Sequence, residues 1–176
     1  MRECIIKLLE EYIRNVQCCQ ETCSVFDVAY RRPNFPENIS ENIVILHFNK
    51  HFESNLRKLD SGDVGTFNEV KNQVERVEVK CFTSDGPISF GPKEAWDHLV
   101  LVDGTRYAER YFVFYYVPFS NTSDIIQSIR INKTQTFGEQ CLAGRRPRIN
   151  PQALLSILGE DDLVQKVSEG YIEDLI

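Results

Sequence analysis

One segment of the sequence carries ionisable side chains whose spacing could do chemistry. Residues 74–82, VERVEVKCF, alternate as a strand does, with Val77, Val79 and Cys81 on one face. Glu78 and Lys80 share the opposite face, about 7 Å apart. Asp63 lies fifteen residues before Glu78 in a Gly-flanked turn that can return to the same sheet edge. The spacing therefore predicts that two acids and one lysine can meet at one point.

Two carboxylates at such a point would bind a hard divalent ion such as Mg²⁺ through oxygen. Lys80 is the matching cation, which could hold or help deprotonate an attacking water and offset charge that grows on phosphorus oxygens. This is the chemistry of phosphodiester hydrolysis. The alternative is structural: Glu78 and Lys80 form a solvated pair on a strand face, and Asp63 is an ordinary turn residue.

These residues resemble the PD-(D/E)xK nuclease superfamily, in particular the small Type II restriction endonucleases. The match consists of GDV at residues 62–64 and VEVK at residues 77–80, although Ser-Gly precedes the acid where the name-giving Pro would stand. The resemblance implies that Asp63 and Glu78 bind Mg²⁺ together with the main-chain carbonyl of Val79, while Lys80 serves the nucleophilic water. It also implies site-specific hydrolysis of double-stranded DNA.

Further stretches are similar to restriction endonucleases of bacteria and of large DNA viruses: FPENISENI, SDGPISFGPKEAWD, INKTQTF and RRPRIN. The likeness covers most of residues 33–150. It implies an α/β (α+β) fold, a restriction-endonuclease-like core with a central mixed β-sheet flanked by helices. Members commonly carry a supporting Glu on a preceding helix, and Glu41 is the candidate preferred over Glu37 and Glu53.

A site-specific nuclease also needs phosphate contacts for affinity and side chains that read base edges. Arginines can pair with guanine edges or phosphates, amides with adenine, and Lys or Thr with phosphate oxygens. The predicted DNA-binding residues are Ser84 and Asp85, after the catalytic strand, and Asn132, Lys133, Thr134, Gln135, Gln140, Arg145, Arg146 and Arg148. The alternative is that RRPR is a solvated basic turn and that the amides are ordinary loop residues.

The net charge of −6 argues at first against nucleic acid as a partner. However, residues 149–176 hold six acids and one base, while residues 133–148 hold four bases and one acid. Most of the negative excess therefore lies in the tail, and the predicted recognition segment is basic.

The remaining pattern predicts the elements that position these residues. Residues 3–19 have helical periodicity, and Ser40 can N-cap a second helix through 43–50, which we prefer to a buried strand for IVIL. Two apolar runs, WDHLVLVD and RYFVFYYVPF, predict neighbouring central strands. Asn150 and Pro151 open a helix that Gly159 ends, within an acidic helical segment at about 151–176. We expect one nuclease domain over 1–176.

No apolar run approaches the length of a membrane span, so we expect a soluble, intracellular, cytoplasmic protein that binds no membrane. Because one chain offers one active site and duplex DNA has two strands, we expect a homodimer, with the N-terminal helix and the acidic C-terminal helices as candidate interfaces. The restriction hypothesis also implies a companion DNA methyltransferase.

Two side features have competing explanations. Cys18, Cys19 and Cys23 could form a metal cluster, but reduced cysteines packed as small apolar groups are the preferred interpretation because no CxxC pair occurs. His47 and His51 could form a helix-borne metal pair of a His-Asn-His type nuclease, or be ordinary helix histidines.

Two other functions remain open. One is a structure-specific repair or recombination nuclease of the same superfamily. The other is a non-enzymatic protein-binding domain, for which no metal requirement is expected.

Overall fold

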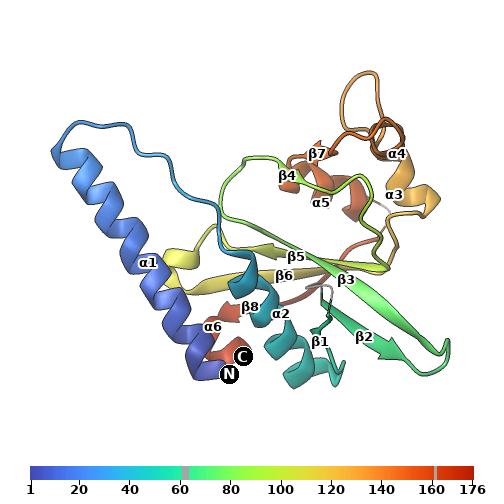
Figure 1. Cartoon of the computed structure of the whole chain (residues 1–176), viewed down its shortest axis with the longest axis horizontal. Helices are drawn as coiled ribbons and strands as arrows, with labels where there is room; N and C mark the ends of the chain where they lie inside the picture. The colour runs from blue at the N-terminus through green and yellow to red at the C-terminus, as the bar shows by residue number, and fades with distance from the viewer. Residues whose placement is uncertain (61–63, 161) are drawn as a thin grey trace.

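The computed structural model of the protein describes residues 1–60, 64–160 and 162–176. Its helices are α1 (Arg2–Val25), α2 (Glu37–Phe52), η1 (Tyr107–Glu109), α3 (Asp124–Ser128), α4 (Phe137–Leu142), α5 (Pro151–Gly159) and α6 (Ile172–Leu175). Its strands are β1 (Arg57–Lys58), β2 (Val64–Asn68), β3 (Gln73–Phe82), β4 (Ile88–Ser89), β5 (His98–Asp103), β6 (Tyr111–Val117), β7 (Arg148–Ile149) and β8 (Gln165–Tyr171). A mixed sheet lies between helices, which confirms the expected fold class (Figure 1).

The central sheet has six strands in the order β1-β2-β3-β5-β6-β8. β3 and β5 run parallel, and the other neighbouring pairs are antiparallel. The two apolar runs of the sequence form β5 and β6, which pair with each other as predicted. β3 lies between β2 and β5, so Glu78 and Lys80 belong to an inner strand.

The alternation of β3 separates two hydrophobic clusters, one on each face of the sheet. Val77, Val79 and Cys81 contact the cluster that α1 and α2 cover, whereas Phe82 belongs to the cluster built with α3, α4 and α5. This confirms the predicted assignment of the two faces. The small sheet of β4 and β7 lies with the second cluster, since Ile88 and Ile149 are both part of it.

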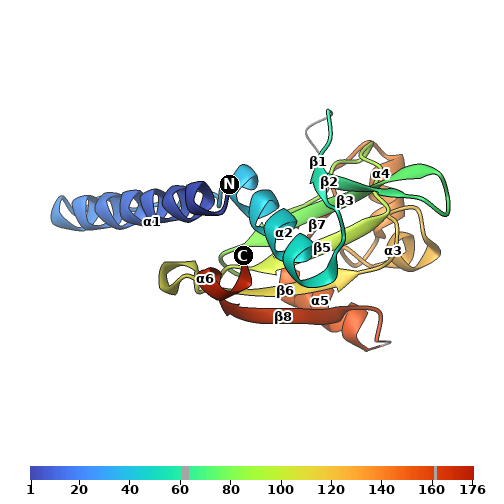
Figure 2. The same cartoon turned by 90° about the horizontal axis from the view of Figure 1, so that it is seen from below.

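The first two helices are confirmed, with changes at their ends. α1 buries Ile5, Leu9 and Val16 but continues to Val25, and its second half extends beyond the sheet (Figure 2). The predicted N-cap at Ser40 is wrong, because α2 already begins at Glu37. Pro36 has the fixed φ that a cap position accepts, and its carbonyl receives the first helical hydrogen bonds from Ile39 and Ser40.

The C-terminal segment is helical only in part. α5 begins as predicted, with the Asn150 side chain accepting a hydrogen bond from the Ala153 N–H. Residues 165–171 were expected within a helical segment but form β8, which pairs antiparallel with β6. β6 has strongly apolar side chains and lies inside the sheet, so its backbone needs hydrogen-bond partners on both edges. β5 provides them on one edge and β8 on the other. No helix among the described residues is long and apolar enough to cross a membrane.

Candidate active site

Glu78 and Lys80 lie next to each other on the same face of β3. The Glu78 Oε1 and Lys80 Nζ atoms are 2.5 Å apart, and the side chains are only 16% and 21% exposed. Leu99 and Leu101 of β5 are their register partners. The Lys80 ammonium also lies 5.7 Å from the centre of the Phe90 ring. An ion pair so well enclosed on an inner strand is not the solvated surface pair of the structural alternative, since charges removed from water need partners or a ligand.

Asp63, the predicted first acid, lies outside the described residues. β2 begins at Val64, which pairs with Val77, the residue directly before Glu78. Among the described residues, no three His, Cys, Asp or Glu side chains come together as metal ligands. Of the predicted cation ligands, the Glu78 carboxylate and the backbone of Val79 belong to the described part of the chain.

A cleft of about 370 Å³ opens beside Lys80 at the carboxyl end of β3. Its walls come from four parts of the chain: the connection between α1 and α2, the first turn of α2, the end of β3 with the following segment through β4, and the RRPR segment. Two predicted DNA-binding residues, Ser84 and Arg146, line the same cleft as Lys80. Its size suits a nucleotide unit rather than a single water.

The other predicted DNA-binding residues take varied positions. Asp85 is exposed, and its carbonyl accepts a hydrogen bond from Asn150 Nδ2 over 2.7 Å, which ties the loop after β3 to α5. Arg145 is exposed, and Arg148 is an exposed residue of β7, paired with Ser89 of β4. Gln140, by contrast, is 9% exposed, so its amide is not presented on the surface.

Residues 132–135 form a tight loop ahead of α4. Asn132 Oδ1 accepts hydrogen bonds from the backbone N–H groups of Thr134 and Gln135, both at 2.9 Å. Lys133 and Thr134 are exposed there. The oxygen of Asn132 thus holds the loop together, and the structure does not bring this loop to the cleft that Lys80 lines.

Glu41, the preferred supporting acid, lies on α2 and forms an ion pair with Lys58 of β1. Of the three acids considered for this role, Glu37 is the one that lines the cleft. Glu53 follows the end of α2 with a left-handed backbone conformation. The structure thus gives Glu41 a cationic partner at the sheet edge.

The histidine pair of α2 is part of the protein interior. His47 is 1% exposed, and its ring stacks on Phe114 with centroids 4.5 Å apart. Its ring nitrogens contact the Leu175 carbonyl and the Ser168 hydroxyl at 2.9 and 2.6 Å. Burial lowers the pKa of His47 below its ordinary value of 6.5. These partners account for both nitrogens, so the metal-pair alternative has no support.

The cysteine cluster of α1 also differs from expectation. All three are free thiols, as expected, but the expected apolar packing is wrong for Cys18 and Cys19, which are exposed, while Cys23 is partly buried. They lie on the half of α1 that extends beyond the sheet (Figure 2). Within the described residues they form no metal site.

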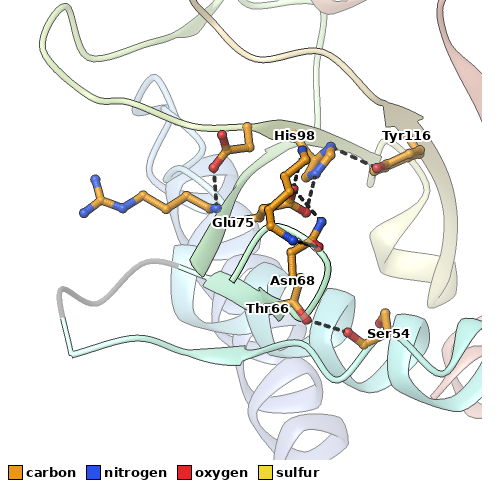
Figure 3. Close-up of polar contacts among 9 residues, drawn as sticks. Ser54, Thr66, Asn68, Glu75, His98 and Tyr116 are labelled. Carbon is orange, nitrogen blue, oxygen red and sulfur yellow. Dashed lines mark hydrogen bonds and ion pairs between the residues drawn. The ribbon is translucent and has the colours of Figure 1, made fainter. Parts of the chain in front are cut away.

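A buried polar network at the beginning of β3 was missed in the sequence (Figure 3). Glu75 is 6% exposed, and its carboxylate accepts hydrogen bonds from Lys71 Nζ at 2.7 Å and Asn68 Nδ2 at 2.9 Å. His98 Nε2 lies 3.2 Å from the second oxygen, and the Tyr116 hydroxyl lies 2.9 Å from His98 Nδ1. A neutral His98 with its proton on Nε2 satisfies both contacts.

The electrostatics of this network follow from its hydrogen bonds. The Lys71 ammonium, with help from His98 and Asn68, lowers the pKa of Glu75 to about 2 despite the opposing effect of burial. The network joins the β2–β3 hairpin to β5 and β6, away from the Glu78 face. A signal was present in the sequence, because Glu75 shares the parity of Val77 and Val79 and so interrupts an apolar face.

The mixed sheet between helices is consistent with a restriction-endonuclease-like fold, and its inner strand β3 carries the Glu78–Lys80 pair beside a cleft lined by basic residues. The family model described as Bsp6I restriction endonuclease matches residues 7–156, and the chain belongs to this family. The predicted resemblance to small Type II restriction endonucleases is thereby confirmed.

A curated relative agrees with the family match. The chain is 35% identical over 119 residues to the Type II restriction enzyme Bsp6I of Bacillus sp. (strain RFL6). The aligned part covers 66% of this chain and 62% of that enzyme, so the chain spans less than two thirds of its relative. No solved structure matches the chain.

Proposed function

We propose that this chain is a Type II restriction endonuclease, which hydrolyses phosphodiester bonds of double-stranded DNA at a short specific sequence in the presence of Mg²⁺. The observation that carries the proposal is the enclosed Glu78–Lys80 pair on β3, with Lys80 lining a cleft of nucleotide size. Membership of the Bsp6I family and the name of the curated relative support the same activity.

Lys80 has the central role in this proposal. Its ammonium has three N–H donors. One is directed to Glu78, and the ammonium also lies over the Phe90 ring. The remaining donors can hold the attacking water and a phosphate oxygen, so that the positive charge is already in place when negative charge develops in the transition state.

The donor set suits a hard divalent cation. The Glu78 carboxylate, the Val79 carbonyl and the predicted ligand Asp63 are oxygen donors of the kind that Mg²⁺ takes. When bound, such a cation supplies Lewis-acid stabilisation of the phosphate charge. Glu78 then has two tasks, to hold the cation and to orient Lys80, while Glu41 would act only through Lys58, its observed partner.

For DNA binding, Ser84 and Arg146 are the strongest of the predicted residues because they share the cleft with Lys80. Asp85, Arg145 and Arg148 are exposed around it, and we propose that the arginines read guanine edges or bind phosphate. The loop of Asn132, Lys133, Thr134 and Gln135 would contact DNA farther from the scissile bond. Gln140 would then support α4 from within.

We further propose a homodimer, since two strands must be cut and each chain contributes one Glu78–Lys80 pair. The projecting half of α1 is the candidate interface, because Val25 and Phe26 at its end are 78% and 72% exposed. A companion DNA methyltransferase would protect the host genome, and the cytoplasm would be the place of action.

Cleavage of a supercoiled plasmid tests the proposal. Wild-type protein should cut the plasmid with Mg²⁺ and leave it intact with EDTA, and Lys80→Ala and Glu78→Gln should each lose at least about 100-fold in rate. Lys7→Ala, an exposed lysine of α1, is the matched control and should cut normally. Urea unfolding of each variant checks the fold. Equal cleavage by Lys80→Ala and wild type would refute the assigned role.

A structure-specific nuclease is an outcome of the same experiment. If the plasmid stays intact while branched duplexes are cut, the catalytic role of Lys80 stands and the Type II assignment does not. If no DNA is cut under any condition, the binding-domain alternative is favoured.

A further inference from the structure

The cleft beside Lys80 has a second basic wall that the sequence patterns did not indicate. Arg32 and Asn34, from the connection between α1 and α2, line it together with the loop after β3 and Arg146. Figure 1 shows this connection descending toward α2 next to the segment that links β3 to β4. Residues more than a hundred positions apart thus face one space.

The cleft is cationic in a chain that is acidic as a whole. Arg32, Lys80 and Arg146 are the basic residues of its lining, and Glu37 is the acid. The net charge of the chain is −6, so this gathering of cations opposes the general charge. Cations collected around one space of nucleotide size attract a polyanion, and a DNA strand is such a ligand.

The Arg32 guanidinium lies over an aromatic ring. Its guanidinium carbon lies 5.6 Å from the centre of the Tyr107 ring. Tyr107 is 3% exposed and packs against Phe35 and Tyr12, with ring centroids 5.9 and 5.6 Å away. A cation–π contact of this kind uses none of the guanidinium N–H groups as hydrogen-bond donors to an acceptor oxygen, so they can bind a ligand.

Arg32 has no acidic partner within the described part of the chain: no ion pair is formed there between its guanidinium and a carboxylate. The side chain is exposed and lies over the Tyr107 ring, a cation–π contact that favours this position of the guanidinium. A guanidinium already favoured in one position loses less conformational entropy when it binds an anion, and its fork matches two phosphate oxygens.

We propose that Arg32 binds a backbone phosphate of the DNA strand next to the phosphate that is cut, and that it positions the strand against Lys80. The inference rests on the proposed nuclease function and deepens it. Arg32 would bind and position the strand, whereas the Glu78–Lys80 pair of the same cleft would act at the phosphate that is cut. A phosphate contact is independent of base sequence, so it contributes equally on every duplex.

A DNA-binding experiment tests the inference. The affinity for a mixed-sequence duplex of about 30 base pairs is measured by fluorescence anisotropy in Ca²⁺ at several salt concentrations. Arg32→Ala should weaken binding about 10-fold and reduce the slope of log K against log salt by about 1. Arg32→Lys should restore most of both, since a phosphate accepts a point charge. Arg31→Ala is the matched control: Arg31 is exposed and does not line the cleft, so its effect should be small.

Plasmid cleavage with Mg²⁺ gives a second readout. Arg32→Ala should raise KM by a similar factor and change kcat less, whereas a purely structural role would lower the urea midpoint and leave the salt slope unchanged. If Arg32→Ala binds with the wild-type slope while the wild type cuts DNA, the inference is refuted and the nuclease function stands. If the wild type neither binds nor cuts DNA, both are refuted.

Discussion

Replacing Glu75 by Gln tests the network at the beginning of β3. The substitution keeps the shape of the side chain and removes its charge. The variant lacks the charge-assisted contacts with Lys71 and His98 that hold the pKa of Glu75 at about 2 in the wild type. Because the carboxylate is almost fully buried, it cannot exchange these partners for water. We therefore expect the β2–β3 hairpin to be held less firmly to β5.

The magnitude follows from linkage between proton binding and folding. Lowering a carboxyl pKa from 4.5 to about 2 corresponds to about 3 kcal/mol at about 1.4 kcal/mol for each pKa unit. The Lys71 side chain is 59% exposed, and solvent weakens that partner. A loss on the order of 2 kcal/mol at pH 7 is therefore expected. The contribution is complete above pH 4.5 and is lost as the pH falls toward 2.

Urea unfolding at pH 7, 5, 4 and 3 measures this effect. The difference between wild type and Glu75→Gln should be largest at pH 7 and 5 and should shrink below pH 4.5. Glu69→Gln, an exposed acid on the same hairpin, is the control and should stay within about 0.5 kcal/mol of the wild type. Equal stability of Glu75→Gln and wild type at pH 7, or a difference that does not change with pH, would refute the account of the network.

Two further stability predictions concern His47 and Thr136. Burial lowers the pKa of His47, so as the pH drops below 6.5 the unfolded chain binds a proton at this histidine before the folded chain does, and the free energy of unfolding should fall. In urea unfolding between pH 7.5 and 5.5, the stability of His47→Gln should change less with pH than that of the wild type. An equal pH dependence would contradict this. Thr136 and Glu139 form a capping box at α4, so Thr136→Ala should cost about 1 kcal/mol, while no change in the thermal midpoint would count against the cap.

The sequence predicts the elements that depend on local pattern. β3 is readable because its apolar residues alternate, and β5 and β6 are readable because their apolar runs are long enough for strands and end at turn residues. α5 has an Asn cap followed by Pro, which is a local signal as well. Among these elements, β3 carries the Glu78–Lys80 pair, and the others pack around β3.

The features that the sequence did not reveal depend on tertiary contacts. β8 has a mixed polar pattern and is a strand because the edge of β6 needs a partner. Glu75 and His98 are 23 residues apart, and only the pairing of β3 with β5 brings them together. Arg32 and Arg146 are more than a hundred positions apart, and they line one cleft only because the fold brings the connection between α1 and α2 and the RRPR segment to the end of β3. Local sequence patterns contain no information on such tertiary contacts.

Sequencing the ends of DNA fragments tests the central claim most directly. Long phage-length duplex DNA is incubated with the protein in Mg²⁺, in parallel with EDTA and with Lys80→Ala, and the ends of the products are sequenced. The proposed function predicts discrete fragments with the wild type in Mg²⁺ alone, with the same short sequence at every cut. Ends of random sequence, or discrete fragments that also appear with EDTA or Lys80→Ala, would contradict it.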